Sequence, residues 1–165
     1  MHDMKQSIAQ RLNAQPEALT HLLFNLSEEQ IRSRPLPEKW SIYENLVHLA
    51  RYHEIFLQRI EAIQTMATPV FPAYKAEDDP GFYTWQQKTY AQLMQDFNTD
   101  RTQLNALLNS FNETQLSFTG KHSVYGLTMN IEGWTEFFLL HEAHHFLTIL
   151  KLSALVNKER IFGLA

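Results

Sequence analysis

Four long stretches of the chain carry apolar residues at the three- and four-residue spacing of an amphipathic helix. This spacing predicts helices over about residues 3–26, 41–65, 84–110 and 128–157. Leucine, glutamine, glutamate and alanine, which favour helix, are frequent in these stretches, and the chain has only 5 glycines. The pattern therefore predicts an all-α protein, a single-domain four-helix bundle over residues 1–165.

Local signals indicate where these helices begin and end. Ser41, followed by Glu44 three residues later, is typical of a capping box at the start of the second helix. The same pattern at residues 27–30 and 112–115 predicts two short capped helical turns. Pro16 lies inside the first helix, where the missing N–H predicts a kink or a break just before it.

Residues 66–83 form the long connection between the second and third helices. This segment contains three prolines, a glycine and an acidic run, and it shows no helical spacing. Connections of this length are often functional, or they cross between distant helix ends.

Composition excludes several classes of protein and site. The net charge of -4 and the absence of a Lys/Arg cluster argue against a nucleic-acid partner. The chain has no cysteine, which excludes disulfides, thiolate ligands and a protein thiol nucleophile. The apolar stretch over residues 134–156 is interrupted by charged and histidine residues, so we expect no membrane span. The first residues lack a signal-peptide pattern, and a cytoplasmic protein is expected.

A His-x-x-x-His pair, His141 and His145, lies in the last helix. Residues four apart project from one helix face, so both imidazoles can reach one metal ion. Their stripe is otherwise apolar and contains Trp134, Phe138, Leu152 and Val156. Buried imidazoles need hydrogen-bond partners or a ligand. Two other interpretations of the pair remain open: satisfied core histidines, or histidines on an exposed face.

A catalytic metal site needs a third protein ligand, and the second helix offers His48 and His53. Its apolar face is defined by Ile42, Leu46, Leu49, Phe56, Ile60 and Ile63. At about 100° per residue, His53 falls near the centre of that face. His48 lies roughly a quarter-turn or more to one side. Periodicity alone therefore favours His53.

Two segments resemble the DinB/YfiT-like family, whose members are thought to be metalloenzymes. The segment WSIYENLVHL (residues 40–49) resembles the family's Trp-Ser/Thr…His-Leu segment, and HEAHHFLTI (residues 141–149) resembles its C-terminal His-x-x-x-His segment. The resemblance implies that His48, His141 and His145 hold a divalent ion. One departure concerns residues 147–148, which are Leu-Thr where many relatives carry Gly-Gln.

We expect the remaining histidines and carboxylates to support the site, to cap a helix or to be solvated. With His48 as ligand, His53 is expected to be buried or to support the site, and His144 is a weaker alternative ligand. Glu44 is the nearest carboxylate that could orient His48, although capping explains it equally well. Three histidines are expected to be solvated: His2, His21 and His122. Two glutamates are expected to be solvated helix charges: Glu54 and Glu142.

A three-histidine site suits Zn²⁺, Ni²⁺, Fe²⁺ or Mn²⁺ as cofactor, and the sequence does not choose among them. The resemblance implies a metal-dependent hydrolase or a transferase of low-molecular-weight thiols, acting on a small-molecule substrate. No residue stands out as general base. The alternative is a non-catalytic, metal-stabilised helical dimer that serves as a binding or stress-response module. A plain helical dimer whose histidines bind nothing is a weaker third interpretation.

The last helix carries a second apolar stripe on the side away from the histidine pair. It consists of Leu139, Ala143, Phe146 and Leu150. A helix that is apolar on two sides is enclosed by neighbours or lies at an interface. We expect a homodimer through this stripe. The other interpretation is that the stripe covers a neighbouring helix or the 66–83 connection.

Overall fold

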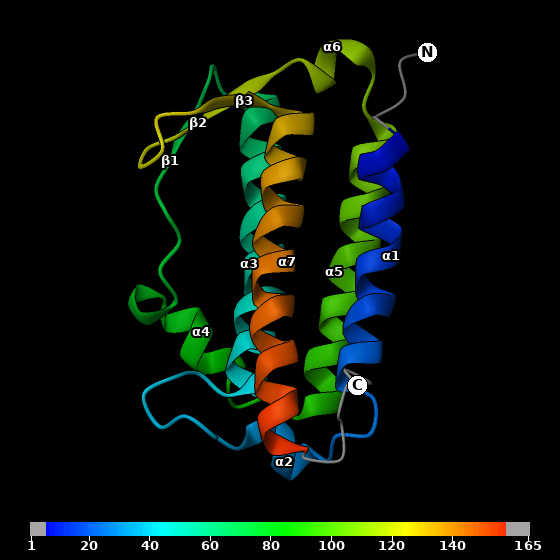
Figure 1. Ribbon diagram of the computed structural model, residues 1–165. Helices are drawn as coiled ribbons and strands as arrows, with labels where there is room; N and C mark the ends of the chain where they lie inside the picture. The colour runs from blue at the N-terminus through cyan, green and yellow to red at the C-terminus, as the bar shows by residue number, and fades with distance from the viewer. Residues whose placement is uncertain (1–5, 158–165) are drawn as a thin grey trace.

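A computed structural model describes residues 6–157, and four long helices dominate it (Figure 1). They are α1 (Gln6–Leu23), α3 (Ile42–Thr65), α5 (Tyr90–Ser110) and α7 (Ile131–Val156). In Figure 1, α1 and α7 run downwards while α3 and α5 run upwards. The predicted all-α four-helix bundle is confirmed. None of the described helices is long and apolar enough to cross a membrane.

The capping signals in the sequence produce the expected helix starts. Short helices α2 (Glu28–Arg32) and α6 (Glu113–Leu116) both begin with a capping box, as predicted. At α3, the Ser41 hydroxyl accepts from the Glu44 backbone N–H at 3.1 Å. The Glu44 carboxylate accepts in turn from the Ser41 N–H at 2.8 Å. These bonds satisfy backbone donors that the first helical turn leaves free.

The long connection crosses between opposite ends of the bundle. Because α3 and α5 run in the same direction, the chain must return along the bundle before α5 can begin (Figure 1). On the way it forms β1 (Val70–Phe71), the 3₁₀ turn η1 (Ala76–Asp78) and α4 (Pro80–Trp85). α5 begins at Tyr90 rather than at residue 84, because Thr89 supplies its own capping box.

A three-stranded sheet covers one end of the bundle. It combines β1 with β2 (Thr119–His122) and β3 (Thr128–Asn130); β2 pairs parallel to β1 and antiparallel to β3. The sequence predicted an all-α protein and no sheet, because strands this short show no alternating pattern. The expectation that His122 is solvated is wrong. It is 3% exposed, and its ring stacks 5.9 Å from that of Trp134.

α1 continues through Pro16 without a break. Proline removes the N–H that would bond to the carbonyl four residues earlier, here that of Leu12. The Arg101 guanidinium donates to this carbonyl at 2.7 Å. A buried side chain from α5 thus replaces the lost backbone bond. Of the kink or break that the sequence predicted, the break is not found.

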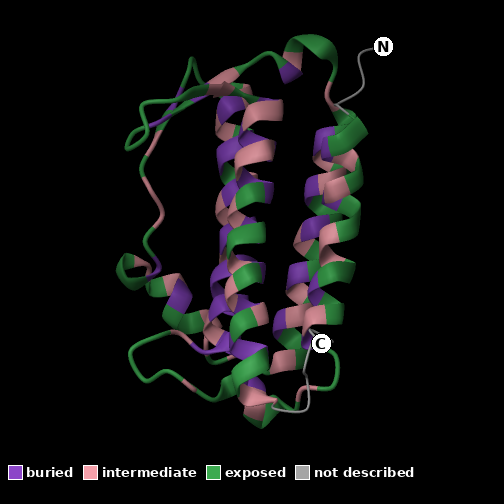
Figure 2. Cartoon of the chain, in the orientation of Figure 1, coloured by how far each residue is buried: buried purple, intermediate pink, exposed green. Residues whose placement is uncertain are grey.

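Buried residues recur along α7 (Figure 2), and they include Leu139 and Phe146 of its second apolar stripe. Leu139 is fully buried and Phe146 is 9% exposed. Phe146 belongs to a core cluster that includes Leu19 and Leu23 of α1. Two of the four stripe residues, Leu139 and Phe146, are therefore buried within the chain, in line with the second interpretation. Ala143 is exposed.

The homodimer itself stays a prediction. The dimer was predicted through the stripe itself, of which Ala143 is exposed and Leu150 is partly exposed. Self-association there would remove the remaining apolar surface from water. Light scattering at micromolar concentration is expected to give the mass of two chains, and a monomer mass would contradict the prediction.

Candidate metal centre

Three histidines from two neighbouring helices meet between α3 and α7. His48 comes from α3, and His141 and His145 come from α7. Nε2 of His48 lies 3.0 Å from Nε2 of His141. One potential ligand atom of each residue lies within 4.8 Å of those of the other two. The three histidines that the family resemblance implied as ligands therefore lie together, and we call His48, His141 and His145 the triad.

The environment keeps all three imidazoles neutral. Burial lowers the pKa of His48 to about 3, of His141 to about 2 and of His145 to about 4, and neighbouring histidines add to the effect. The Nε2 atoms of His48 and His141 lie 3.0 Å apart, so only one of these two nitrogens can carry a proton and the other keeps its lone pair. Neutral nitrogens gathered in this way suit a cation, so the cluster could hold a divalent metal ion.

The lowered pKa values predict that acid destabilises the metal-free protein. The unfolded chain takes up protons on its histidines near pH 6.5, whereas the folded triad does so only below about pH 4. The free energy of unfolding should therefore fall between pH 6.5 and pH 4, by up to about 1.4 kcal/mol per pH unit for each histidine. Burial also lowers the pKa of His53 and His122, which adds in the same direction.

Urea unfolding of chelator-treated protein at pH 7 and pH 5 measures this effect. The variant His21→Gln is the control, because that side chain is 77% exposed on α1. It should keep the wild-type pH dependence. Equal stability at both pH values, or higher stability at pH 5, would contradict the neutral triad.

Asn45 orients one histidine of the triad, and sequence analysis missed it. Its Oδ1 accepts from Nδ1 of His145 at 2.9 Å, and its Nδ2 donates to the Ser41 carbonyl at 2.8 Å. This arrangement leaves Nε2 of His145 with the free lone pair. The available signal was an asparagine on a buried helix, one turn before His48. Glu44 caps α3 and pairs with Arg34, so its capping interpretation is confirmed.

Replacing Asn45 with alanine is expected to weaken metal binding by about 10- to 100-fold, because the His145 ring loses its orienting acceptor. Competition with a chromogenic chelator measures the affinity. Asn45→Asp, which keeps an acceptor oxygen, should recover most of it. Asn98→Ala, at an exposed position of α5, is the matched control. Unchanged affinity in Asn45→Ala would remove this role from Asn45.

Aromatic rings enclose the triad. The rings of Trp40 and Tyr74 each lie 5.2 Å from that of His48, and the Tyr52 ring lies 4.3 Å from that of His141. These contacts fix the imidazole rotamers and lower the local dielectric, which is the physical cause of the lowered pKa values. Sequence analysis did not predict any of the three walls.

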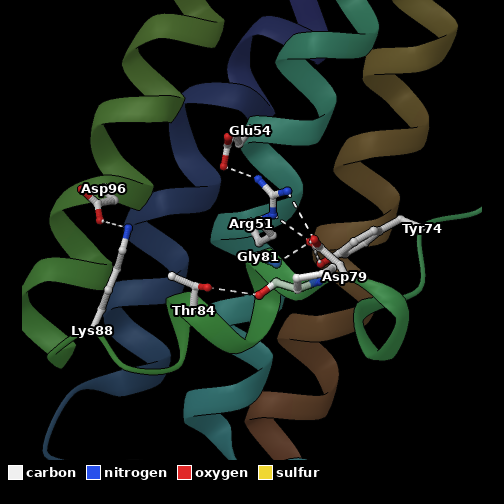
Figure 3. Close-up of polar contacts among 9 residues, drawn as sticks. Arg51, Glu54, Tyr74, Asp79, Gly81, Thr84, Lys88 and Asp96 are labelled. Carbon is white, nitrogen blue, oxygen red and sulfur yellow. Dashed lines mark hydrogen bonds and ion pairs between the residues drawn. The ribbon is translucent and has the colours of Figure 1, made fainter.

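Tyr74 belongs to the long connection between α3 and α5, which we call the crossover, and Asp79 holds its side chain in place (Figure 3). The Asp79 carboxylate accepts from the Tyr74 hydroxyl at 3.1 Å, from Arg51 Nε at 2.7 Å and from the Gly81 N–H at 2.9 Å. A Cβ at Gly81 would lie only 2.7 Å from Arg51 Nε, so glycine allows this close approach. The crossover thereby contributes to the site. Glu54 is partly exposed and pairs with Arg51.

A buried charged cluster lies beside the triad. Glu142, 1% exposed, forms an ion pair with Arg101, and its Oε1 lies 3.0 Å from Nε2 of the fully buried His53. Burial opposes ionisation of Glu142, but Arg101 and His53 outweigh it and lower the pKa of this carboxyl group. The expectation that His53 is buried is confirmed. The expectation that Glu142 is solvated is wrong, because it faces α5 rather than water.

The other candidate histidines lie outside the triad. His144 is exposed on α7 and is not part of the cluster. His21 is exposed, as expected. His2 lies outside the described residues.

Comparisons with known proteins agree with this architecture. The structure resembles YfiT from Bacillus subtilis, described as a probable metal-dependent hydrolase with an unusual four-helix bundle topology. The TM-score is 0.73 at 19% identity, over 90% of this chain and 85% of that chain. It also resembles a protein assigned to the DinB family from Exiguobacterium sibiricum 255-15, with a TM-score of 0.64 at 19% identity, over 100% and 99% of the two chains.

At the level of sequence, a search of curated proteins finds no significant match. The sequence profile of the DinB superfamily, in contrast, matches residues 11–149. This range includes all three histidines of the triad and most of the chain. The protein belongs to the DinB superfamily.

Proposed function

We propose that this protein is a metal-dependent hydrolase in which His48, His141 and His145 hold one divalent ion. The observation that carries the proposal is the convergence of three neutral imidazoles beside a cavity that reaches His145. Within residues 6–157, the cluster contains three potential ligands and no fourth His, Asp or Glu. Three protein ligands leave a position for water or substrate, as in catalytic rather than structural sites.

An ion in this site would act as a Lewis acid, lowering the pKa of water and polarising a carbonyl or phosphoryl group. The chain's own groups prepare the site. The triad supplies uncharged donors, Asn45 fixes the tautomer of His145, and the aromatic walls restrict water. The likeness to YfiT, described as a probable metal-dependent hydrolase, supports the proposal. Imidazole ligands are compatible with Zn²⁺, Ni²⁺, Fe²⁺ or Mn²⁺.

Transfer of a small thiol to an electrophile is the second candidate. The chain has no cysteine, so the thiol would enter as a co-substrate and use the same free positions. A non-catalytic, metal-stabilised module, for example in a stress response, is the alternative outside catalysis.

One panel of assays separates these functions. Metal-loaded protein is offered an activated ester, an activated phosphodiester, a peptide amide, and an electrophile with a small thiol. Turnover of a hydrolytic substrate that disappears in the His48→Ala/His141→Ala/His145→Ala variant supports the hydrolase. Conjugation of the thiol alone would establish the second candidate instead. Bound metal without any turnover across the panel would favour the non-catalytic module.

A further inference from the structure

A cavity of about 480 Å³ opens beside the triad, between the loop that precedes α3 and the C-terminal half of α7. Its lining includes His145 of the triad and the buried Asn45. We propose that this cavity binds the non-reacting part of the substrate, and that the substrate combines an apolar body with an anionic group, a carboxylate or a phosphate. The identification of this ligand as a substrate rests on the proposed function.

The apolar part of the cavity is built from both of its walls. Trp40 and Leu36 come from the loop before α3, and Leu152 and Leu155 come from α7. Leu36 is 46% exposed and Leu155 is 50% exposed. Small-molecule sites are typically concave, of 300–1,000 Å³, and mostly apolar with a few placed polar groups. The size and lining of this cavity fit that description.

Two lysines supply the positive charge of the same cavity. Lys39 lies on the loop wall and Lys151 on the α7 wall, and neither forms an ion pair with another residue in the range 6–157. Elsewhere in this range, Lys75 pairs with Asp78 and Lys88 pairs with Asp96, while the exposed Lys121 on β2 has no ion pair either. Two lysines without an ion pair among residues 6–157 thus line one cavity from two separate segments, in a chain whose net charge is -4.

One carboxylate lines the cavity, but it does not neutralise both lysines. Glu38 interacts electrostatically with Arg34, whose pKa it helps to raise. The exposed His144 also lines the cavity and could donate a hydrogen bond to an anion. The remaining imbalance is positive, and it favours an anionic ligand over a neutral or cationic one.

The arrangement of these groups indicates how a substrate would lie. Its reacting group would be near His145, and its anionic group near Lys39 and Lys151. Interactions with a remote, non-reacting group can position the reacting one. The lysines would therefore select the substrate without taking part in the chemistry.

Three matched probes test the proposal: 4-phenylbutyrate, 4-phenylbutyl phosphate and the neutral 4-phenylbutanol. Their binding is titrated by NMR against metal-stripped protein and again after zinc is added. The variant Lys39→Gln/Lys151→Gln should weaken binding of the anionic probes by about 5- to 10-fold, since each exposed ionic contact contributes modestly. Lys121→Gln is the control, because Lys121 is exposed on β2 at the other end of the bundle (Figure 1).

Tighter, lysine-dependent binding of an anionic probe supports the proposal, and the tighter of the two identifies the preferred group. Binding of the alcohol with equal affinity would overturn it. Binding that appears only with zinc and does not change in the double variant would overturn it as well, because the anion would then coordinate the metal. Failure of the protein to take up Zn²⁺, Ni²⁺, Fe²⁺ and Mn²⁺ alike would overturn the proposed function instead, while lysine-dependent binding to stripped protein would still support the anionic site.

Discussion

Replacing His141 with alanine is expected to weaken binding of a divalent ion by more than about 100-fold and to abolish any metal-dependent activity. Loss of an outer group that only orients a ligand already costs 10–100-fold, and the loss of a direct ligand should cost more. His141 Nε2 faces Nε2 of His48, so its removal leaves a pair that cannot enclose an ion. Chelator competition and metal analysis of the purified variant measure the effect.

The matched control is His144→Ala, three residues further along α7. His144 is exposed and lies outside the cluster, so its removal should leave metal content and affinity unchanged. Circular dichroism and thermal melting of both variants establish that the bundle is intact. Full metal binding by His141→Ala, or equal losses in the two variants, would contradict the assignment of the ligands.

Replacing Arg101 with methionine is expected to lower the free energy of unfolding by about 3–5 kcal/mol. The change leaves the Glu142 carboxylate buried without its cationic partner. It also removes the hydrogen-bond donor to the Leu12 carbonyl, which the backbone of Pro16 cannot replace because proline has no N–H. An uncompensated buried charge is among the most destabilising features of a core. Urea unfolding measures the difference.

Two further variants separate this effect from the loss of an ordinary ion pair. Arg11→Met breaks the partly exposed pair with Glu136 and should cost no more than about 1 kcal/mol. Arg101→Met/Glu142→Leu removes both buried charges and should recover part of the lost stability. If Arg101→Met were as mild as Arg11→Met, the buried cluster would not carry the stability assigned to it.

The sequence predicted the helical framework because helix spacing and capping are local properties. Ser41 with Glu44 sets the start of α3 by bonds within four residues, and the structure contains those bonds. The same local reasoning predicted a kink or a break at Pro16. The helix does not break there, because the compensating donor, Arg101, comes from another helix. The sheet was missed because β1 and β3 have 2 and 3 residues and derive their order from pairing with β2.

The choice between His48 and His53 shows why helix phase alone is insufficient here. Periodicity assumes one buried face, but α3 contacts α5 on one side and α7 on another, and α4 covers part of a third. His53 lies on the α5 side, against Arg101, while His48 lies on the α7 side, against His141. The resemblance to a family supplied the information that the apolar pattern lacked.

The burial of Glu142 could not be predicted from one sequence. A glutamate between two histidines is usually a solvated helix charge, and its partner, Arg101, lies 41 residues away on α5. The pairing depends on how α5 and α7 are placed relative to each other, which neither segment encodes alone. The same applies to Tyr74, whose position over His48 depends on the bonds of Asp79.

The most direct test of the metal centre is elemental analysis of the untagged wild-type protein, purified without chelators. Its matched control is the variant in which all three histidines of the triad are replaced by alanine. The structure predicts one divalent ion per wild-type chain, among Zn²⁺, Ni²⁺, Fe²⁺ and Mn²⁺, and none in the variant. A wild-type protein that retains no ion and takes up none of these four when they are supplied would rule out the metal centre.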